Sequence, residues 1–430
     1  MPFIDLTRVE PFEICSIRPP TENYSLTFRL TRNCGWNKCL FCPAYKYGAT
    51  FSRRSIEEVK QDVDRAEMIH ALLRNHGIGT DGSTQTSYEE ATDLIKKIRA
   101  AKGVEKENDR SPITLDEDEN GDTQWAWFAS WFKDQPAIED SISHVLSWQL
   151  GGGETCFLGD SNSLILSPDF FTQALAYIKK KFPKLRRFTI YGRTKSAAKK
   201  SVEELEAFRG AGLHRIHFGL ESGSDKVLAF MKKGVTANEH REGCLKAKEA
   251  GLSCCVYVMP GLGGAEWSEE HACETARVLT DIAPNYVRLR SLEVFGGTGL
   301  SAAVQRGDFC EASEEQVVRE IRIMVEGIDA PCEIVSDSAA NLLAVNGRLP
   351  RDRERMLAVI DEYLALSPRA KLAFSLESRL RSFIGQYGGM TQDVLHAVAP
   401  YVTDHGIDIA NAPAEEVMNA IRLIRSKLMP

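Results

Sequence analysis

The sequence predicts an α/β protein in which about six β-α units surround a parallel sheet. Two observations predict this fold class. Short β-rich runs alternate with helical stretches from about residue 24 to residue 300, which is typical of parallel sheets because each crossover needs a long connection. Several helical stretches open with Ser or Thr followed shortly by Glu, the pattern of a helix-capping box.

The expected elements follow in order along the chain. The strands are expected at residues 24–31, 154–160, 186–191, 214–220, 252–258 and 285–292. Candidate helices begin near Ser55, Pro168, Ser201, Thr236 and Ser268. This pattern divides the chain into an N-terminal segment (residues 1–23), a β-α domain (24–300) and a C-terminal helical region (301–430) that contains a short strand at 332–335.

A long stretch at about residues 71–153 breaks the β-α alternation and predicts an inserted, mostly helical subdomain. Within it, residues 116–122 resemble the start of a calcium loop, but its twelfth position is Trp127 where a bidentate Glu is needed. We interpret it as a solvated acidic turn. The aromatic side chains that follow share helical spacing, which favours core packing over a substrate lid: Trp125, Trp127, Phe128, Trp131 and Phe132.

Composition limits the classes of function. The 430 residues carry a formal net charge of -7, which disfavours nucleic acid as a partner because phosphate backbones are bound by clustered Lys and Arg. No segment approaches the roughly 18 continuous apolar residues that span a bilayer, and no basic-then-apolar leader opens the chain. The eleven cysteines are scattered apart from one cluster, which favours a metal site in a reducing, cytoplasmic setting over a disulfide framework.

That cluster places Cys34, Cys39 and Cys42 within nine residues directly after the first strand. Thiolate-rich loops hold either zinc or an iron-sulfur cluster, and both are usually completed by a fourth protein ligand. No fourth Cys or His lies nearby. An iron-sulfur cubane with one open iron can bind a substrate directly, whereas a structural zinc site short of one ligand would be unusual. The spacing therefore favours an iron-sulfur cluster over zinc or unligated cysteines.

The loop resembles the cluster loop of the radical S-adenosylmethionine (radical SAM) superfamily, with four rather than three residues between the first two cysteines. Phe41 is similar to the aromatic residue that packs against adenine in those enzymes. Three further stretches resemble family elements. Gly159 and Asp160 stand where a glycine-rich motif contacts the methionine amino group. Glu221 and Ser222 resemble a motif that contacts ribose or the methionyl end, and the turn from Met259 through Gly261 resembles the motif whose backbone meets adenine.

The resemblance implies a partial (β/α)6 barrel of the TIM type, with the helical insertion after its first unit and a mostly helical C-terminal region. Successive side chains of a strand point to opposite faces of the sheet. The alternate positions that are apolar pack under the helices, so the other positions point into such a barrel. By that rule the interior receives Arg29, His217, Glu221, Tyr257, Arg288 and Arg290, with Arg193 at a strand end. His217 and Tyr257 are the candidate catalytic residues, although a satisfied core role for His217 is the alternative.

Arg193, Arg290 and Lys233 are candidate partners of the cofactor carboxylate, Lys233 by resemblance alone. The four interior arginines exceed what one cofactor carboxylate can neutralise, which predicts an anionic small-molecule substrate. Internal ion pairs are the alternative explanation.

The resemblance implies an oxygen-sensitive enzyme in which a [4Fe-4S] cluster reductively cleaves S-adenosylmethionine to a 5'-deoxyadenosyl radical, which abstracts hydrogen from the substrate. An external one-electron donor such as flavodoxin or ferredoxin is implied as a partner. The sequence leaves the net reaction open. A non-catalytic iron-sulfur or zinc-binding carrier is the competing hypothesis, and S-adenosylmethionine binding distinguishes the two.

Overall fold

The computed structural model describes residues 4–15, 17–46, 50–80, 83–104, 136–404 and 406–428. The chain divides into two compact units. The first unit contains Met1–Asn37, Ala44–His217 and Lys246–Ser253, and the second contains Lys38–Pro43, Phe218–Leu245 and Cys254–Pro430. Strand β6 (Leu213–Glu221) carries residues of both units.

An eight-stranded sheet has the strand order β1-β4-β5-β6-β7-β8-β9-β10. In the first unit, β1 (Leu26–Arg29) pairs in parallel with β4 (Thr155–Gly159), which pairs in parallel with β5 (Arg187–Gly192). In the second unit, β8 (Tyr286–Leu289) lies parallel to β7 (Ser253–Val258) and to β9 (Cys332–Val335). The six predicted strands correspond to β1, β4, β5, β6, β7 and β8, so the α/β fold on a parallel sheet is confirmed.

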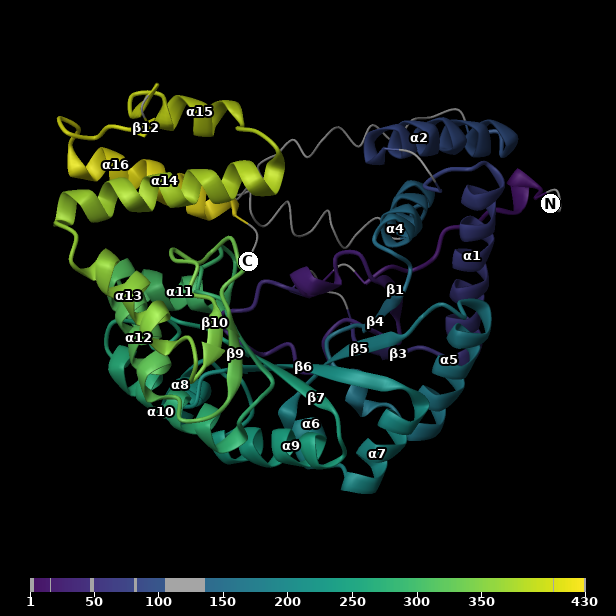
Figure 1. Cartoon of the computed structure of the whole chain (residues 1–430), viewed down its shortest axis with the longest axis horizontal. Helices are drawn as coiled ribbons and strands as arrows, with labels where there is room; N and C mark the ends of the chain where they lie inside the picture. The colour runs from purple at the N-terminus through teal and green to yellow at the C-terminus, as the bar shows by residue number, and fades with distance from the viewer. Residues whose placement is uncertain are drawn as a thin grey trace. The chain divides into compact units, whose positions relative to one another are not determined.

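The helices of the first unit begin where their capping residues predict. Ser55 and Ser201 form complete capping boxes with Glu58 and Glu204, because each serine satisfies a backbone N–H that the first helical turn leaves free. Neighbouring helices α1, α5 and α7 line the strands of this unit (Figure 1). The helices of the unit are α1 (Ile56–Asn75), α2 (Thr84–Ala101), α4 (Ile138–Leu150), α5 (Pro168–Lys181), α6 (Thr194–Ala198) and α7 (Val202–Ala211).

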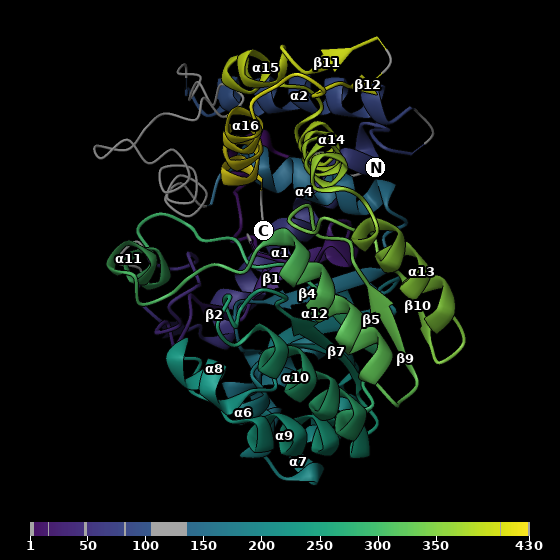
Figure 2. The ribbon, with the colours of Figure 1, turned by 90° about the vertical axis from the view of Figure 1, so that its left-hand side faces the viewer.

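In the second unit, helices follow the strands along the chain. Helices α10 and α12 pack side by side (Figure 2). The helices centred on this unit are α8 (Asp225–Phe230), α9 (Ala237–Glu249), α10 (Ser268–Ile282), α11 (Gly299–Arg306), α12 (Glu314–Gly327), α13 (Arg353–Leu364), α14 (Pro368–Tyr387), α15 (Gln392–Val398) and α16 (Ala414–Lys427).

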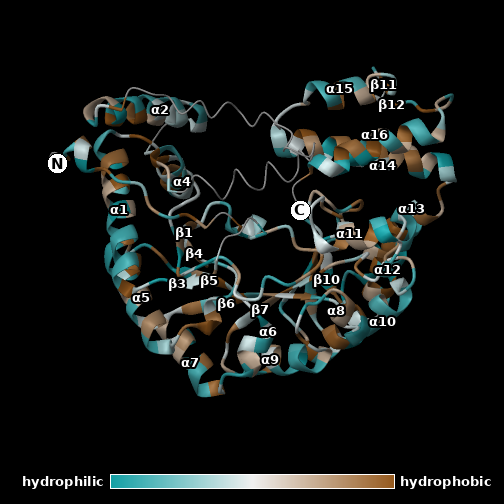
Figure 3. Ribbon diagram, turned by 180° about the vertical axis from the view of Figure 1, so that it is seen from behind, coloured by the Kyte–Doolittle hydropathy of each residue, from teal (hydrophilic) through white to brown (hydrophobic). Residues whose placement is uncertain are grey.

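The C-terminal helices have a core of their own. Helices α14, α15 and α16 bury one hydrophobic cluster that includes Leu376, Phe383, Val394 and Ile424, and apolar residues are visible along α14 and α16 in Figure 3. A small hairpin of β11 (Val402–Thr403) and β12 (Gly406–Ile407) joins α15 to α16. The predicted helical tail is thus present, with a hairpin that the sequence pattern did not indicate.

Three details differ from the expectations. Helix α1 continues to Asn75, so the start expected for the insertion at residue 71 falls inside a helix. The sheet continues beyond residue 300, because β9 joins β8 and β10 (Gly347–Leu349) pairs antiparallel with β9. A short hairpin of β2 (Thr31–Arg32) and β3 (Ser52–Arg53) was also not expected. The acidic turn at 116–122 and the aromatic stripe at 125–132 lie outside the described residues.

Candidate active site

The clustered cysteines lie in the segment between β2 and β3. None of the eleven cysteines, all of which lie in the described ranges, forms a disulfide. Cys34, Cys39 and Cys42 are partly exposed, whereas six others are buried and two are exposed. Partly exposed thiols outside disulfides suit a ligand role. Over the described ranges, no group of three or more His, Cys, Asp and Glu side chains is already arranged to hold a metal ion. Ligation by the three cysteines therefore stays a prediction from their spacing.

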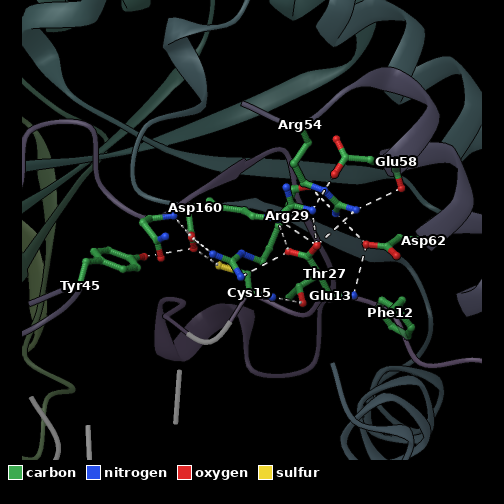
Figure 4. A network of polar contacts seen from close by, with 12 residues as sticks. Phe12, Glu13, Cys15, Thr27, Arg29, Tyr45, Arg54, Glu58, Asp62 and Asp160 are labelled. Atoms are coloured by element: carbon green, nitrogen blue, oxygen red, sulfur yellow. Dashed lines mark hydrogen bonds and ion pairs between the residues drawn. The ribbon is translucent and has the colours of Figure 1, made fainter. Parts of the chain in front are cut away.

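In the first unit, Asp160 ties together both ends of the segment that carries the cysteines, residues 33–45, which we call the cysteine loop (Figure 4). Its Oδ2 accepts hydrogen bonds from the backbone N–H of Asn33 at 2.7 Å and from Nη2 of Arg29 at 2.7 Å. Its Oδ1 accepts from the hydroxyl of Tyr45 at 3.1 Å and from Sγ of Cys15 at 3.4 Å. Both carboxylate oxygens are thus occupied by the protein itself.

The backbone at these contacts is in an unusual conformation. Asn33, Asn37 and Tyr45 have φ angles of 66°, 41° and 61°, a left-handed region that Asn tolerates and Tyr rarely adopts. Nδ2 of Asn37 donates to the carbonyl oxygen of Tyr45 at 2.6 Å, and Nζ of Lys46 donates to the carbonyl oxygen of Asn37 at 2.7 Å. These contacts hold the cysteine loop in a shape that local preference alone would not select.

A second layer of charges supports Arg29. Glu13 lies 3.4 Å from Nη1 of Arg29 and also binds Arg32 and Arg54 (Figure 4). Burial opposes the charge on Glu13, but the three arginines outweigh it and hold the pKa of its carboxyl below the ordinary value. Arg54 in turn binds Asp62 of α1 at 2.7 Å. The layer therefore connects the N-terminal segment, the hairpin and α1 to the Asp160 site.

In the second unit, Phe41 packs against the turn that resembles the adenine motif. Phe41 belongs to a hydrophobic cluster with Leu262, against which Cys39, Cys42 and Met259 also pack. The backbone of Leu40 is fixed as well: its N–H donates to the carbonyl oxygen of Met231 at 3.0 Å, and its carbonyl oxygen accepts from Leu300 at 2.9 Å. The part of the cysteine loop in this unit is thus held beside the Met259 turn.

Glu221 and Lys233 form an ion pair of 2.9 Å in the same unit. Nζ of Lys233 also lies 5.7 Å from the ring centroid of Phe41, within the range of a cation–π contact. A Cβ on Gly219 would stand 2.4 Å from Oε1 of Glu221 and 3.0 Å from Nζ of Lys233. Any side chain at residue 219 would displace the ends of Glu221 and Lys233 from this position.

The turn from Met259 to Gly264 is supported by buried polar groups. The N–H of Gly261 donates to Oε2 of Glu320 at 2.6 Å, and Nε2 of His271 lies 3.1 Å from the carbonyl oxygen of Met259. The hydroxyl of Ser222 lies 2.8 Å from Nδ1 of the same histidine. Burial raises the pKa of Glu320 to about 7 and lowers the pKa of His271 to about 4. Ser222 and Met259 are thereby joined through one neutral imidazole.

The two candidate catalytic residues lie in different units. His217 is fully buried, with Nε2 3.7 Å from Oε1 of the equally buried Glu22, a contact that supports the alternative of a structural role. Tyr257 is buried, and its ring centroid lies 5.9 Å from Cζ of Arg288. Catalytic roles for both residues remain predictions.

The interior arginines were expected to lack enough protein counter-charges, but some of them form ion pairs with carboxylates of the chain. Arg29 is paired with Asp160 and Glu13, and Arg288 is paired with Asp337. Glu221 pairs with Lys233 and not with an arginine. Internal ion pairs, the alternative explanation, therefore account for two of the four arginines. The argument from a surplus of positive charge fails for these two.

Arg193 and Arg290 have other surroundings. Cζ of Arg193 lies 4.8 Å from the ring centroid of Trp36 in the cysteine loop. The buried Nε of Arg290 has no hydrogen-bond partner in the described part of the chain. Because Arg288 is already paired with Asp337, Arg290 is better placed than Arg288 to bind a ligand carboxylate.

Sequence reasoning missed several residues that shape these sites. None of these residues belongs to a recognisable motif. They are Tyr45 in the cysteine loop, Glu13 in the irregular N-terminal segment, His271 in α10 and Glu320 in α12. A polar residue on the apolar face of an amphipathic helix was the available signal for Glu320, which is buried in α12 beside Ile321 and Met324.

Comparison with known proteins finds a match to one family model. Residues 122–276 match the family model described as the Radical SAM superfamily. This segment is thus similar to a superfamily of enzymes whose cofactors are a [4Fe-4S] cluster and S-adenosylmethionine. The matched segment begins after the cysteine loop, so the match does not extend to the Cys34–Cys42 spacing.

Individual relatives are distant. A tRNA uridine(34) acetyltransferase of Methanocaldococcus jannaschii is 23% identical over 120 residues, which are 28% of this chain and 22% of that protein. The chain thus matches less than a quarter of that relative's length. Among solved structures, the archaeal Methanocaldococcus infernus Elp3 with an N-terminal deletion has 16% identity and a TM-score of 0.36, covering 48% of this chain and 53% of that one. Methylornithine synthase (PylB) has 12% identity and a TM-score of 0.39, covering 78% and 68%.

The sequence predicted neither a membrane span nor a nucleic-acid partner. No helix in the described ranges is long and apolar enough to cross a membrane. The expectation that nucleic acid is disfavoured as a partner gains no support, because the curated relatives are named for a tRNA.

The residues present fit the cofactors of the superfamily. The donor set is three partly exposed thiols outside any disulfide, the type of ligand that iron-sulfur clusters use. Beside Cys39 and Cys42, the cluster around Phe41 and Leu262 offers an apolar surface next to the Met259 turn, which suits an adenine ring.

Proposed function

We propose that Cys34, Cys39 and Cys42 hold the [4Fe-4S] cluster of this enzyme and that S-adenosylmethionine binds beside it. The observation that carries the proposal is the way the cysteine loop is held. Asp160 ties its two ends in the first unit, and Phe41 anchors its centre against Leu262 and Met259 in the second. When bound, these cofactors supply radical chemistry that begins with a one-electron reduction of the sulfonium.

The chain's own residues would bind and orient the cofactor. We assign the adenine to Phe41, Met259 and the Gly261 backbone, and the methionyl end to Glu221 and Lys233. Ser222 acts through His271, which holds the Met259 carbonyl. Arg290 is the candidate for the cofactor carboxylate because its Nε lacks a partner among the described residues. Gly159 and Arg193, which belong to the first unit, are further candidates for cofactor contacts.

Asp160 receives a revised role in this proposal. Its two oxygens already accept four hydrogen bonds from the protein, so binding an ammonium group would require some of them to break. We therefore assign Asp160 to positioning the cysteine loop and leave the methionine amino group to Glu221.

The test is anaerobic reconstitution followed by two measurements on the same sample. Titration with S-adenosylmethionine is expected to show saturable binding, and reduction with dithionite is expected to release 5'-deoxyadenosine. A carrier or scaffold protein would keep its iron and show neither. Zinc retained in place of iron after reconstitution would contradict the cluster assignment.

The substrate is proposed as an anionic small molecule, with an external one-electron donor such as flavodoxin or ferredoxin. A tRNA is the second candidate, favoured by the names of the curated relatives and opposed by the net charge of -7. A filter-binding titration with bulk tRNA at low and high salt separates the two, because phosphate contacts weaken steeply with salt.

A further inference from the structure

Arg18 is a cation in the first unit that lacks a counter-charge. It lies directly before Pro19 and Pro20, so its backbone is restricted to an extended conformation. Its side chain is half-buried, and its Nε is buried without a hydrogen-bond partner within the described ranges. Among those residues no carboxylate pairs with its guanidinium.

Other arginines of this unit show how it usually handles buried positive charge. Each has at least one carboxylate within ion-pair distance: Arg29 with Asp160, Arg32 with Glu13, Arg54 with Asp62 and Arg187 with Glu22. An unpaired charge in a partly buried position is costly, because it loses water without gaining a partner. Arg18 departs from the pattern of its neighbours.

Two groups that interact with Arg18, Cys15 and His144, are neutral near pH 7. Burial lowers the pKa of Arg18, while Cys15 and Tyr191 are the groups that favour its charge. Burial and the negative charge of Asp160 raise the pKa of Cys15 well above its ordinary value, so it stays a thiol. Burial, followed by the charge of Arg18, lowers the pKa of His144 to about 3. None of these neighbours supplies an anion.

Tyr191, whose electrostatic interaction favours the charge of Arg18, lies on β5. The Tyr191 ring makes edge contacts with Phe157 at 5.0 Å and with His217 at 6.1 Å. Thr189 shares this face of the strand, because side chains two residues apart point the same way. Its fully buried Oγ1 also lacks a hydrogen-bond partner among residues that the structure describes. One side of β5 thus carries an unpaired hydroxyl at Thr189 and the Tyr191 side chain that interacts electrostatically with Arg18.

We propose that Arg18 binds a carboxylate or phosphate group of the substrate at the face of β5 that carries Thr189 and Tyr191, an inference that rests on the proposed function. An oxyanion matches the planar fork of arginine and would satisfy its free Nε–H. Arg290 in the second unit is already available for the single carboxylate of S-adenosylmethionine. A second uncompensated arginine therefore indicates a second anion, which the substrate supplies.

The test uses the full chain, reconstituted anaerobically, with inorganic phosphate and succinate as separate probes in calorimetric titrations. The variants are R18Q, R18K and the control R186Q, whose parent side chain is 79% exposed. We expect wild type and R186Q to bind one of the two probes saturably. R18Q is expected to bind it at least about tenfold more weakly, since a charge-assisted pair contributes more than about 1.4 kcal/mol. Iron content should be equal in all samples.

Three results would overturn the inference: binding of neither probe by wild type, equal affinity in wild type and R18Q, or a selective loss of S-adenosylmethionine affinity in R18Q, which would assign Arg18 to the cofactor. If R18Q does not fold, R18K keeps the charge without the fork, and unchanged probe affinity in R18K would count against bidentate binding. This test can fail independently of the proposed function. Wild-type protein that holds no iron would contradict the proposed function, whereas the anion titration alone decides whether Arg18 binds an anion.

Discussion

At the scale of single residues, Asp160 joins the two ends of the cysteine loop through contacts with the protein itself. Its carboxylate is almost fully buried and accepts from the backbone of Asn33 and the hydroxyl of Tyr45, which lie at opposite ends of the cysteine loop. Burial, and then the negative charge of Asp160, raise the pKa of Tyr45 well above its ordinary value. The phenol therefore remains a donor across the physiological pH range.

Replacing Asp160 by Asn should loosen the cysteine loop. The amide cannot accept all four hydrogen bonds and leaves Arg29 with a weaker partner, so we expect a loss of about 3 kcal/mol in the free energy of unfolding. Iron release to a chelator should also become faster. D93N is the matched control, because Asp93 is 67% exposed. If D160N keeps iron as wild type does but loses S-adenosylmethionine affinity, Asp160 is a ligand contact and the positioning role is wrong.

Glu320 gives the chain a pH dependence of known sign. Burial raises its folded-state pKa to about 7 from 4.5, so the folded protein holds a proton that the unfolded chain releases. This contribution to stability is complete below about pH 4.5 and is lost as pH rises to about 7. At roughly 1.4 kcal/mol per pKa unit, the loss is about 3 kcal/mol.

The measurement compares urea unfolding of wild type and E320Q between pH 5 and pH 8. The stability of wild type relative to E320Q should fall across this range and level off above about pH 7. His271 lies 3.8 Å from Glu320 and its pKa of about 4 gives the opposite slope, but it is present in both proteins and largely cancels. A constant difference between the two proteins would show that Glu320 does not titrate in this range.

At the scale of elements, the end of β6 and the segment after α8 act together. Gly219 lies under the Glu221–Lys233 pair, which in turn contacts Phe41. Changing Gly219 to Ala should push this pair aside, because the new methyl group would stand 2.4 Å from Oε1 of Glu221. We expect several-fold weaker S-adenosylmethionine binding with unchanged iron content, measured on reconstituted protein.

Gly210 offers a matched control for that substitution. It lies in α7, and a Cβ there would meet no atom within 4 Å. Ala is favoured over Gly in a helix by roughly 0.5–1 kcal/mol, so G210A should be slightly more stable than wild type and bind the cofactor equally well. Equal cofactor affinity in G219A and wild type would remove the Glu221–Lys233 pair from the binding site.

At the scale of the whole molecule, the sequence predicted what depends on local patterning. The six strands follow from their apolar runs, and helices α1, α7 and α9 begin after Ser55, Ser201 and Thr236 because each cap pairs with a Glu three residues later. Strand β10 was missed because its three residues carry a Gly and an Arg and pair antiparallel. Too few side chains alternate there to produce a pattern.

The site was predicted less completely for a different reason. The cysteines and Phe41 form a local motif, and the glycine at residue 219 sits in a recognisable strand end. The partners of Asp160 and Arg29 come from segments up to 145 residues away in sequence, and such pairings leave no periodic signal. Arg18 belongs to the irregular N-terminal segment, where nothing in the sequence indicated that its charge would lack a carboxylate partner.

The central claim is that one cluster is held by Cys34, Cys39 and Cys42. Iron determination after anaerobic reconstitution of wild type and of the triple Ala variant tests it most directly. We predict about four irons per wild-type chain and none in the triple variant, with C273A, which removes an exposed cysteine outside the loop, matching wild type. A triple variant that retains the iron, or a wild type with about eight irons, would contradict the account.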